Sequence, residues 1–267
     1  MLPFIHIFSK PIPMYGLCIA TGILVASFFA NLIIKKEHKD FDDFIIFSVV
    51  LFGMGMFGAK LLFILVTFPI SQIPEQLLYL VTSKEKSAAG FVFYGGILLG
   101  LPGFFIAKVI TKKPIMAYLP LFACITPIIH GFGRLGCLCA GCCYGIPYEG
   151  FCAVHYHNPI STVQSGIGIF PIQLLEALLL LILGMILVLL RLKMQKSLHK
   201  DIFFIFAYLV PYAVIRFFLE FLRGDSGRGQ VFIFSTSQLI SLMIFLSSLT
   251  FVVFFELKFH HKQQKIA

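Results

Sequence analysis

The chain has 267 residues, of which 59% are hydrophobic and only 12% are charged, and its formal net charge is +9. Its mean hydropathy of +0.96 is higher than a water-soluble surface tolerates, so we expect an integral membrane protein. The basic residues are divided among short loops, which favours topological signals and contacts with lipid headgroups and argues against a nucleic-acid partner.

Seven apolar segments are candidates for membrane-spanning helices, each of which needs about 20 mainly apolar residues. Clusters of charge, proline and glycine separate them, and they lie near residues 13–34, 44–68, 91–110, 115–129, 170–190, 202–222 and 237–257. The fourth is short, so it is tilted, partly buried or continued by 130–136. The first is longer than a signal-peptide core and lacks a small-residue cleavage site, so we interpret it as a permanent span.

These segments predict an all-α membrane protein with seven transmembrane helices, forming a single integral-membrane domain over residues 1–267. Most of the 21 Lys and Arg residues follow the first, third, fifth and seventh predicted spans. Because cytoplasmic loops carry the excess of Lys and Arg, the N-terminus is predicted to lie outside and the C-terminus in the cytoplasm. The outer-side segments are then those near 69–90, 130–169 and 223–236.

Several ionisable side chains lie inside the apolar segments, where they are costly and normally face a cavity or one another. Tyr212, Arg216 and Glu220 are spaced four residues apart, so a helix would present all three on one face. The alternative for Arg216 and Glu220 is an ion pair that only neutralises itself. Lys60 and Glu176 fit a functional role and a plain helix contact or snorkelling amine equally well.

The stretch HGFGRLGCLCAGCCYG, residues 130–145, lies at the outer end of the fourth predicted span. A glycine-rich, arginine-bearing segment at membrane depth is tolerated only where it is buried in protein or lines a wet cavity. We therefore predict a site there, with His130 and Arg134 on one helix face because they are four residues apart. Glycines remove side chains where backbone and ligand approach closely. The glycines concerned are Gly131, Gly133, Gly136, Gly141 and Gly145.

Five of the seven cysteines lie between residues 137 and 152, and three interpretations of them stay open. The first is a disulfide on the oxidising side of the membrane, in which Cys142 or Cys143 pairs with Cys137 or Cys152. At least one pair should then be close enough to bridge, with alpha carbons about 4.4 to 6.8 Å apart.

The second interpretation is a metal site that combines these thiols with His130, His155 or His157, although paired C-x-x-C knuckles at zinc spacing are absent from the sequence. The third is a set of buried free thiols, with redox or nucleophilic roles in the minority. Cys18 and Cys124 lie within predicted spans and are most simply small core residues.

Five ordered segments are similar to motifs of one enzyme family. PMYGL at 13–17 resembles its Tyr-Gly near the first span, and FYGGILLG at 93–100 resembles its His-Gly-Gly motif. GRLGCLCAGCCYG at 133–145 resembles its signature, FPIQLLE at 170–176 its His-Pro-Ser-Gln-x-x-Glu segment, and YAVIRFFLEFLR at 212–223 its Tyr-x3-Arg-x3-Glu helix. Together they resemble the prolipoprotein diacylglyceryl transferases, bacterial membrane enzymes that move the diacylglyceryl group of phosphatidylglycerol to the thiol of a lipobox cysteine.

The departures from the family pattern fall within its site. The family signature reads Gly-Arg-x-Gly-Asn-x-x-Asn-Gly-Glu, and here Cys137, Ala140 and Cys142 replace the two Asn and the Glu. Tyr94 replaces the histidine of His-Gly-Gly, and Phe170 replaces the one before Pro-Ser-Gln. The residues that persist, besides the glycines, are Arg134, Gln173, Glu176, Tyr212, Arg216 and Glu220. The resemblance therefore implies that the residues that bind the lipid are retained, and that the residues that bind the acceptor are replaced.

The chemistry that the resemblance implies assigns roles to these residues. A thiolate attacks the glycerol carbon attached to phosphate, so the enzyme must bind an anionic headgroup and stabilise charge on the leaving phosphate. Arg134, Arg216 and Arg223 suit these tasks, because guanidinium forks bind phosphate in a bidentate manner. Glu220 would hold Arg216 in its working rotamer. Arg134 and Arg216 should then converge on one cavity, within roughly 10 Å of each other.

Proton transfer from the acceptor thiol is assigned to His130, because a phenol such as that of Tyr94 titrates near pH 10. Tyr94 would still donate a hydrogen bond to a phosphate oxygen. The alternative for His130 is an ordinary histidine that caps a helix end. The substrate-binding residues implied by the resemblance are Tyr15, Gly95, Gly96, Gly133, Gly136, Gln173, Glu176, Tyr212 and Arg223.

We therefore expect a diacylglyceryl transferase with no cofactor and no metal, in the inner (cytoplasmic) membrane of a bacterium, with its active site near the outer leaflet. Its partners would be phosphatidylglycerol, the lipid bilayer and a prolipoprotein acceptor. One alternative is a related glycerolipid transferase with a different acceptor. Another is a membrane anion or lipid transporter, since broken spans and buried Arg–Glu pairs suit an anion pathway. A membrane thiol oxidoreductase is suggested by the cysteines alone.

Overall fold

The computed structural model describes residues 3–7, 10–82, 92–156, 163, 166–195, 197–225, 230–231 and 233–264. The chain forms two compact units. The first comprises Met1–Glu37 and Pro120–Ala267, and the second comprises His38–Leu119. Helices dominate both units, which confirms the predicted all-α class.

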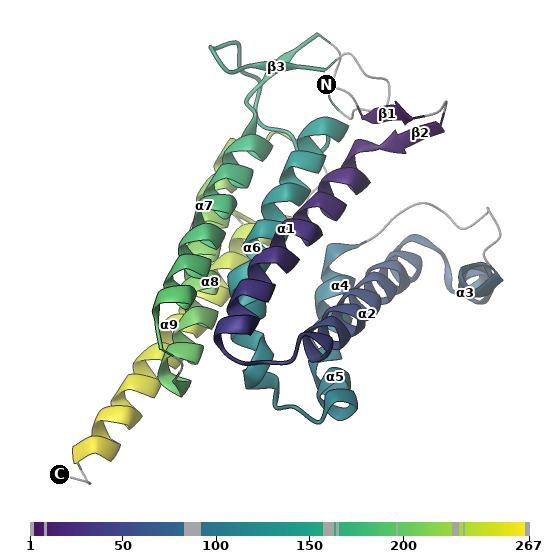
Figure 1. The fold of residues 1–267 in the computed structure, drawn as a ribbon. Coiled ribbons are helices and arrows are strands. Elements are labelled where there is room, and N and C mark those ends of the chain that lie inside the picture. Colours follow the sequence, from purple (N-terminus) through teal and green to yellow (C-terminus); the bar gives the residue numbers. More distant parts are fainter. Residues whose placement is uncertain are drawn as a thin grey trace. The chain divides into compact units, whose positions relative to one another are not determined.

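The described part of the first unit contains five long helices and three short antiparallel hairpins (Figure 1). The helices are α1 (Met14–Lys36), α6 (Ile115–Ala140, which enters this unit at Pro120), α7 (Ile172–Lys193), α8 (Leu198–Leu219, continued by the 3-10 turn η2, Glu220–Leu222) and α9 (Thr236–Gln264). The hairpins pair β1 (Phe4–Ile7) with β2 (Lys10–Pro13), β3 (Val154–His155) with β4 (Gly168–Ile169), and β5 (Gln230–Val231) with β6 (Phe234–Ser235).

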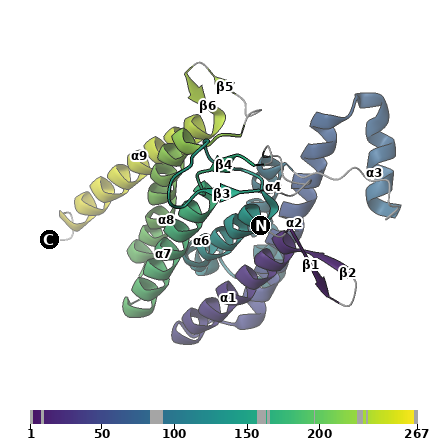
Figure 2. The same cartoon turned by 90° about the horizontal axis from the view of Figure 1, so that it is seen from above.

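Helix α6 packs closely against its neighbours in this unit because glycines lie at the crossing points. A Cβ atom on Gly22 of α1 would lie 2.7 Å from Phe132, and one on Gly131 would lie 2.9 Å from Leu181 of α7. Helices in a membrane associate through such close contacts of small residues. Helix α8 in turn packs against α7 and α9, and Figure 2 shows β3 and β4 above the ends of these helices.

A buried charge cluster, here called the Arg191 cluster, joins α1, α7 and α8 at the end of the bundle opposite β3. Arg191 pairs with Glu37 at 2.5 Å and with Asp201 at 2.6 Å, and all three side chains are buried. The guanidinium carbon lies 4.9 Å from the centroid of the Phe204 ring. Lys36 donates to the carbonyls that end α7, those of Arg191, Leu192 and Met194. A cation at a helix C-terminus satisfies carbonyls that have no partner within the helix.

The second unit contains α2 (Phe41–Thr67), η1 (Ile70–Gln72), α3 (Ile73–Thr82), α4 (Phe93–Gly100), α5 (Gly103–Thr111) and the first turn of α6. Helices α2 and α4 touch at Gly58 and Gly95, where a Cβ atom on either would collide with the carbonyl oxygen of the other. Lys60 of α2 is buried, with its ammonium 5.3 Å from the ring centroid of Phe63. At the other end of α2, Tyr118 lies 3.3 Å from the carboxylate of Asp43.

Six helices among the described residues are long and apolar enough to cross a membrane, namely α1, α2, α6, α7, α8 and α9. The third predicted span, 91–110, is instead divided into α4 and α5, and the break falls at Pro102, which lacks an N–H to continue a helix. The fourth extends to Ala140, so it does continue through 130–136. In the predicted outer segment 69–90, α3 occupies ten residues, and 83–90 lie outside the described residues. Seven spans, their sidedness and the single domain stay predictions.

Candidate functional site

The end of α6 is closed by a turn that draws the signature cysteines together. The N–H groups of Gly141 and Cys142 both donate to the carbonyl of Cys137, at 3.0 and 3.2 Å. Gly141 has a φ of +74°, the left-handed conformation that favours glycine after a helix end. Because the chain turns back at once, Cys142 lies beside Cys137, one helical turn earlier.

The segment after this turn is held between the start of α7 and the end of α8. The amide of Gln173 donates to the carbonyl of Cys142 at 2.8 Å, and Gly224 N–H donates to the carbonyl of Tyr144 at 3.0 Å. A Cβ atom on Gly145 would collide with the carbonyl of Phe170, so this position requires glycine. Three segments that are distant in the sequence, near residues 140, 172 and 222, therefore meet here.

Arg134 and Glu176 form an ion pair between α6 and α7. Arg134 Nε lies 3.1 Å from Glu176 Oε2, and both side chains are largely buried. The other carboxylate oxygen of Glu176 is buried and has no hydrogen-bond partner among the described residues. Of the two interpretations for Glu176, the structure shows a helix–helix ion pair to a residue of the signature.

Arg216 forms the corresponding pair within α8. Its Nη2 lies 2.8 Å from Glu220 Oε2 and donates to Ser237 Oγ of α9 at 3.1 Å. The predicted shared face of Arg216 and Glu220 is thereby confirmed, although α8 ends at Leu219 and Glu220 begins η2. Arg216 Nη1 is buried and has no hydrogen-bond partner among the described residues. One donor of this guanidinium is thus left for water or a ligand.

Two aromatic residues, His130 of α6 and Tyr212 of α8, lie near both arginines. Their ring centroids are 5.1 Å apart in an edge-to-face arrangement, and Tyr208 stacks on Tyr212 at 5.9 Å. Arg134 and Arg216 both lie within electrostatic range of His130 and of Tyr212. The two guanidinium groups thus share the same pair of aromatic neighbours. We call Arg134, Arg216, His130 and Tyr212, with the two glutamates, the paired-arginine site.

The glycines of α6 have a packing explanation. A Cβ atom on Gly133 would lie 3.2 Å from Ile19 of α1, and one on Gly136 would lie 2.9 Å from the Tyr15 ring. Tyr15 therefore rests on the signature helix and lies within electrostatic range of Arg134. The element that approaches Gly133 and Gly136 closely is therefore α1, and the approach of a ligand to these glycines stays a prediction.

The predicted residues of α4 lie in the second unit. Gly95 packs against Gly58, and a Cβ atom on Gly96 would lie 3.3 Å from the carbonyl oxygen of Gly55. The contact of α4 with α2 accounts for both glycines. The backbone of Tyr94 lies in the first turn of α4, and its side chain is outside the described part of the chain.

Arg223 follows η2 and is paired by both nitrogens of its fork with Asp225, at 3.0 and 2.7 Å. Its backbone forms a β-bridge with that of Gly145, which places Arg223 beside residues 141–145, here called the signature loop. Hydrogen bonds with the Cys137 and Cys142 thiols lower the pKa of the Cys143 thiol, and the charges of Arg223 and Arg134 lower it further.

All seven cysteines lie among the described residues and are free thiols. The sulfur atoms of Cys137, Cys142 and Cys143 nevertheless lie within 4.8 Å of one another. We call these three residues the cysteine cluster. Disulfide pairing within it stays a prediction, while Cys152 is exposed and is not part of the cluster.

The other cysteine and histidine predictions have mixed outcomes. The thiol of Cys18, expected to be a simple core residue, hydrogen-bonds with that of Cys139, which joins α1 to α6. Among the described residues, no histidine joins the cysteine cluster, and His155 lies 3.3 Å from Glu149. His157 is outside the described residues.

Sequence reasoning missed two neighbours of the site. Tyr208 lies four residues before Tyr212, so the same spacing argument extended by one turn would have found it. Ser237 lies beyond the last loop, and a lone serine at a helix start gives no signal that it reaches Arg216.

The sequence matches the family model described as prolipoprotein diacylglyceryl transferase over residues 3–254. The chain belongs to this family. It is 34% identical over 240 residues to a phosphatidylglycerol–prolipoprotein diacylglyceryl transferase of Clostridium tetani, which covers 89% of this chain and 90% of the relative. It is 29% identical over 247 residues to the second such transferase of Clostridium perfringens, with 91% of each chain covered. A Lactobacillus johnsonii enzyme of the same name is 29% identical over 243 residues, with 88% and 83% covered.

The resemblance inferred from five segments is therefore confirmed. The protein is a transferase of the prolipoprotein diacylglyceryl transferase family and a multi-pass membrane protein. The match includes the signature loop and the paired-arginine site, which lie between residues 130 and 237.

Proposed function

We propose that the protein transfers the diacylglyceryl group of phosphatidylglycerol to the thiol of a prolipoprotein cysteine and releases glycerol phosphate. Family membership supports the reaction type, and the names of the relatives include both substrates. The observation that carries the proposal is the paired-arginine site, in which two buried guanidinium groups both lie near His130 and Tyr212 within the apolar bundle.

The paired-arginine site is proposed to bind the phosphate of the lipid headgroup. Arginine pairs suit phosphate because each guanidinium offers several donors in a fixed fork. Glu176 and Glu220 each hold one arginine, and Ser237 supports Arg216 from α9. These partners fix the rotamers before the substrate arrives, which is the arrangement that stabilises charge developing on a leaving group. The remaining Nη1 donor of Arg216 supports the same role.

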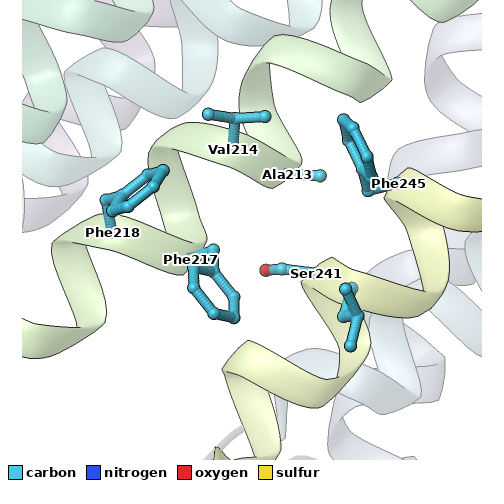
Figure 3. Close-up of a pocket in the computed structure, with 7 residues that line it drawn as sticks. Ala213, Val214, Phe217, Phe218, Ser241 and Phe245 are labelled. Carbon is cyan, nitrogen blue, oxygen red and sulfur yellow. The ribbon is translucent and has the colours of Figure 1, made fainter.

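An apolar cavity of about 190 Å³ between α8 and α9 is proposed to receive an acyl chain of the donor lipid (Figure 3). It is lined by Ala213, Val214, Phe217, Phe218, Ser241, Leu242 and Phe245. Ala213 lies three residues before Arg216 and so on the same face of α8, which means that a lipid chain in the cavity would place its headgroup near the guanidinium. Ser241 supplies the single polar side chain in the lining.

In the proposed reaction, the acceptor thiolate attacks the glycerol carbon that carries the phosphate. A C–S bond forms, the C–O bond breaks, and the electron pair leaves with glycerol phosphate, whose charge the two arginines stabilise. His130, which lies near both arginines, accepts the thiol proton. Tyr15, Gln173, Tyr212 and Arg223 would line the substrate path.

We further propose that α4 and α5 together form the seventh span, with the N-terminus outside, the C-terminus in the cytoplasm and the site near the outer leaflet of a bacterial inner membrane. The six long helices and the distribution of Lys and Arg support this layout. All of it would form one integral-membrane domain.

Reconstitution into phosphatidylglycerol vesicles tests the proposal. With headgroup-labelled lipid and a lipobox peptide, we expect release of labelled glycerol phosphate and a diacylglyceryl mass gain on the peptide cysteine. A lipobox peptide with Ser in place of Cys is the matched control. Transport of label without bond cleavage, or thiol oxidation without lipid consumption, would instead support a transporter or an oxidoreductase.

A second candidate is a related transferase with a different acceptor. Cys137 and Cys142 occupy the positions where the family signature has Asn and Glu, beside the site where the acceptor would enter. Release of glycerol phosphate with a small thiol but not with the lipobox peptide would favour this candidate.

A further inference from the structure

The cysteine cluster has the composition and spacing of a metal site. The sulfur atoms of Cys137, Cys142 and Cys143 all lie within 4.8 Å of one another. In a tetrahedral zinc site with Zn–S bonds of about 2.3 Å, the sulfur atoms are roughly 3.8 Å apart. Small rotamer changes would therefore bring all three thiols onto one ion. A disulfide would use two of the thiols and leave the third beside it, whereas an ion uses all three.

The backbone that carries these thiols is fixed from several sides. The turn at Gly141 places Cys142 beside Cys137, and the Cys142 carbonyl is held by Gln173 of α7. Cys143 has a φ of +56°, which a non-glycine residue adopts only when its surroundings impose it. Its side chain thereby joins the other two. Such outer contacts are what orient the ligands of a metal site.

The charges around the cluster favour a divalent ion. Three thiolates and a divalent cation carry a net charge of −1, whereas a monovalent ion would leave −2. Arg134 and Arg223 both lie within electrostatic range of Cys143, and each is already paired with one carboxylate, Glu176 or Asp225. The surroundings are therefore close to neutral and accommodate one excess negative charge better than two. Thiolate ligands select zinc among the common divalent ions.

We propose that Cys137, Cys142 and Cys143 bind one zinc ion and leave its fourth position open. Three protein ligands with one open position is the pattern of catalytic rather than structural zinc sites. Resting on the proposed function, the open position takes the acceptor thiol. A thiol that coordinates zinc loses its proton. The proton passes to His130, so the charge of the added thiolate is balanced by the imidazolium and the net charge of the site stays at −1. The zinc-bound thiolate then forms the C–S bond as the C–O bond breaks and the electron pair leaves with glycerol phosphate.

Metal analysis of the detergent-solubilised protein, purified under reducing conditions without chelators and loaded with zinc, tests the site without any activity measurement. We expect about one zinc per chain. Zinc affinity is measured by competition with a chromophoric chelator. Loss of an outer-shell contact typically weakens metal binding roughly 10- to 100-fold. Because Cys142→Ser and Cys143→Ser each remove a ligand, both should weaken zinc binding by more than that. Cys152→Ser is the matched control, because Cys152 is exposed and outside the cluster, and it should keep full affinity.

Cobalt provides a second measurement that does not depend on the stability of any variant. Wild-type protein loaded with Co²⁺ should show thiolate-to-cobalt charge-transfer bands, and addition of a small thiol should shift them if the fourth position is open. Absence of zinc and of these bands overturns the site, as does copper in place of zinc or equal zinc affinity in Cys142→Ser and Cys143→Ser.

The activity measurements separate this inference from the proposed function. Zinc-free protein that still transfers diacylglycerol to the lipobox peptide at the wild-type rate overturns the role of zinc in the reaction. Zinc-loaded protein that binds small thiols through zinc but never releases glycerol phosphate contradicts the proposed function and supports the metal site.

Discussion

The first unit contains two clusters in which buried arginines pair with carboxylates, and the surroundings of these arginines differ. In the Arg191 cluster, one guanidinium contacts the carboxylates of Glu37 and Asp201 and the face of the Phe204 ring. Its positive charge is therefore neutralised within the protein. In the paired-arginine site, two guanidinium groups have one carboxylate each and share His130 and Tyr212 between them. Burial of an arginine therefore does not mark a functional site. Arg191 Nη2 and Arg216 Nη1 are both buried without a hydrogen-bond partner among the described residues, so an unpaired donor does not mark one either. The paired-arginine site differs in having one carboxylate for each guanidinium, with His130 and Tyr212 close to both arginines.

The largest expected effect is on the free energy of unfolding, which should depend on the Arg191 cluster. Arg191→Met leaves Glu37 and Asp201 buried without their cation, and we expect a loss of about 3–5 kcal/mol in the free energy of unfolding. Denaturant unfolding in detergent measures it, with Lys193→Gln as the control because Lys193 is exposed at the same end of α7. Transfer activity per folded molecule should be unchanged. An unaltered unfolding free energy would mean that this cluster does not hold the helices together.

The second effect is on turnover. Arg134→Lys and Arg216→Lys keep the charge that pairs with Glu176 and Glu220 but lose the fork, so both variants should fold. We expect kcat/KM for diacylglyceryl transfer to fall about 100- to 1,000-fold, as when one preorganised donor to a developing anion is removed. Lys193→Gln again serves as the control. If the loss of activity merely followed a loss of folded protein, the two clusters would have the same, structural role.

Sequence reasoning located the paired-arginine site better than the Arg191 cluster, for a physical reason. Arg216 and Glu220 lie inside an apolar run, where their cost is visible at once, and helical spacing predicts their contact. Arg191 follows an apolar run, where an arginine also serves as a topological signal, and its partner Glu37 is 154 residues away. Only the fold reveals that the pair is buried.

The same contrast, between contacts that local spacing predicts and contacts that only the fold brings together, applies to the rest of the fold and the site. Long apolar runs predicted six helices, but hydropathy alone gave no sign that the run at 91–110 would be divided. Pro102 does not settle it either, because Pro120 and Pro127 lie inside the unbroken α6. The cysteine cluster depends on one turn: a left-handed Gly141 brings residues five apart into contact, whereas helical spacing alone would have separated them. Ser237 reaches Arg216 only because α8 and α9 pack side by side.

The third effect sharpens the role of the histidine in the paired-arginine site. A base must be unprotonated, so the wild-type rate should fall as the pH falls through the pKa of the imidazole. His130→Gln keeps a similar volume but cannot accept the proton, and we expect a rate about 100-fold lower, without that acid limb. The pH dependence of kcat/KM measures both. A near-normal rate with an unchanged limb would eliminate His130 as the base and leave the arginines untouched.

The smallest expected effect tests whether α9 contributes to the paired-arginine site. Ser237 Oγ accepts a hydrogen bond from Arg216 Nη2, so Ser237→Ala removes one neutral partner of a buried guanidinium whose carboxylate, Glu220, remains. A single hydrogen bond contributes about 0.5–1.5 kcal/mol, and kcat/KM should fall roughly 3- to 10-fold. Ser247→Ala is the matched control, because the Ser247 hydroxyl bonds only to carbonyls of its own helix, at Met243 and Ile244. Since Ser247 is exposed and does not contact the site, its loss should change neither rate nor stability. Equal rates in the two variants would show that Glu220 alone positions Arg216 and that the contact with α9 only packs the helices.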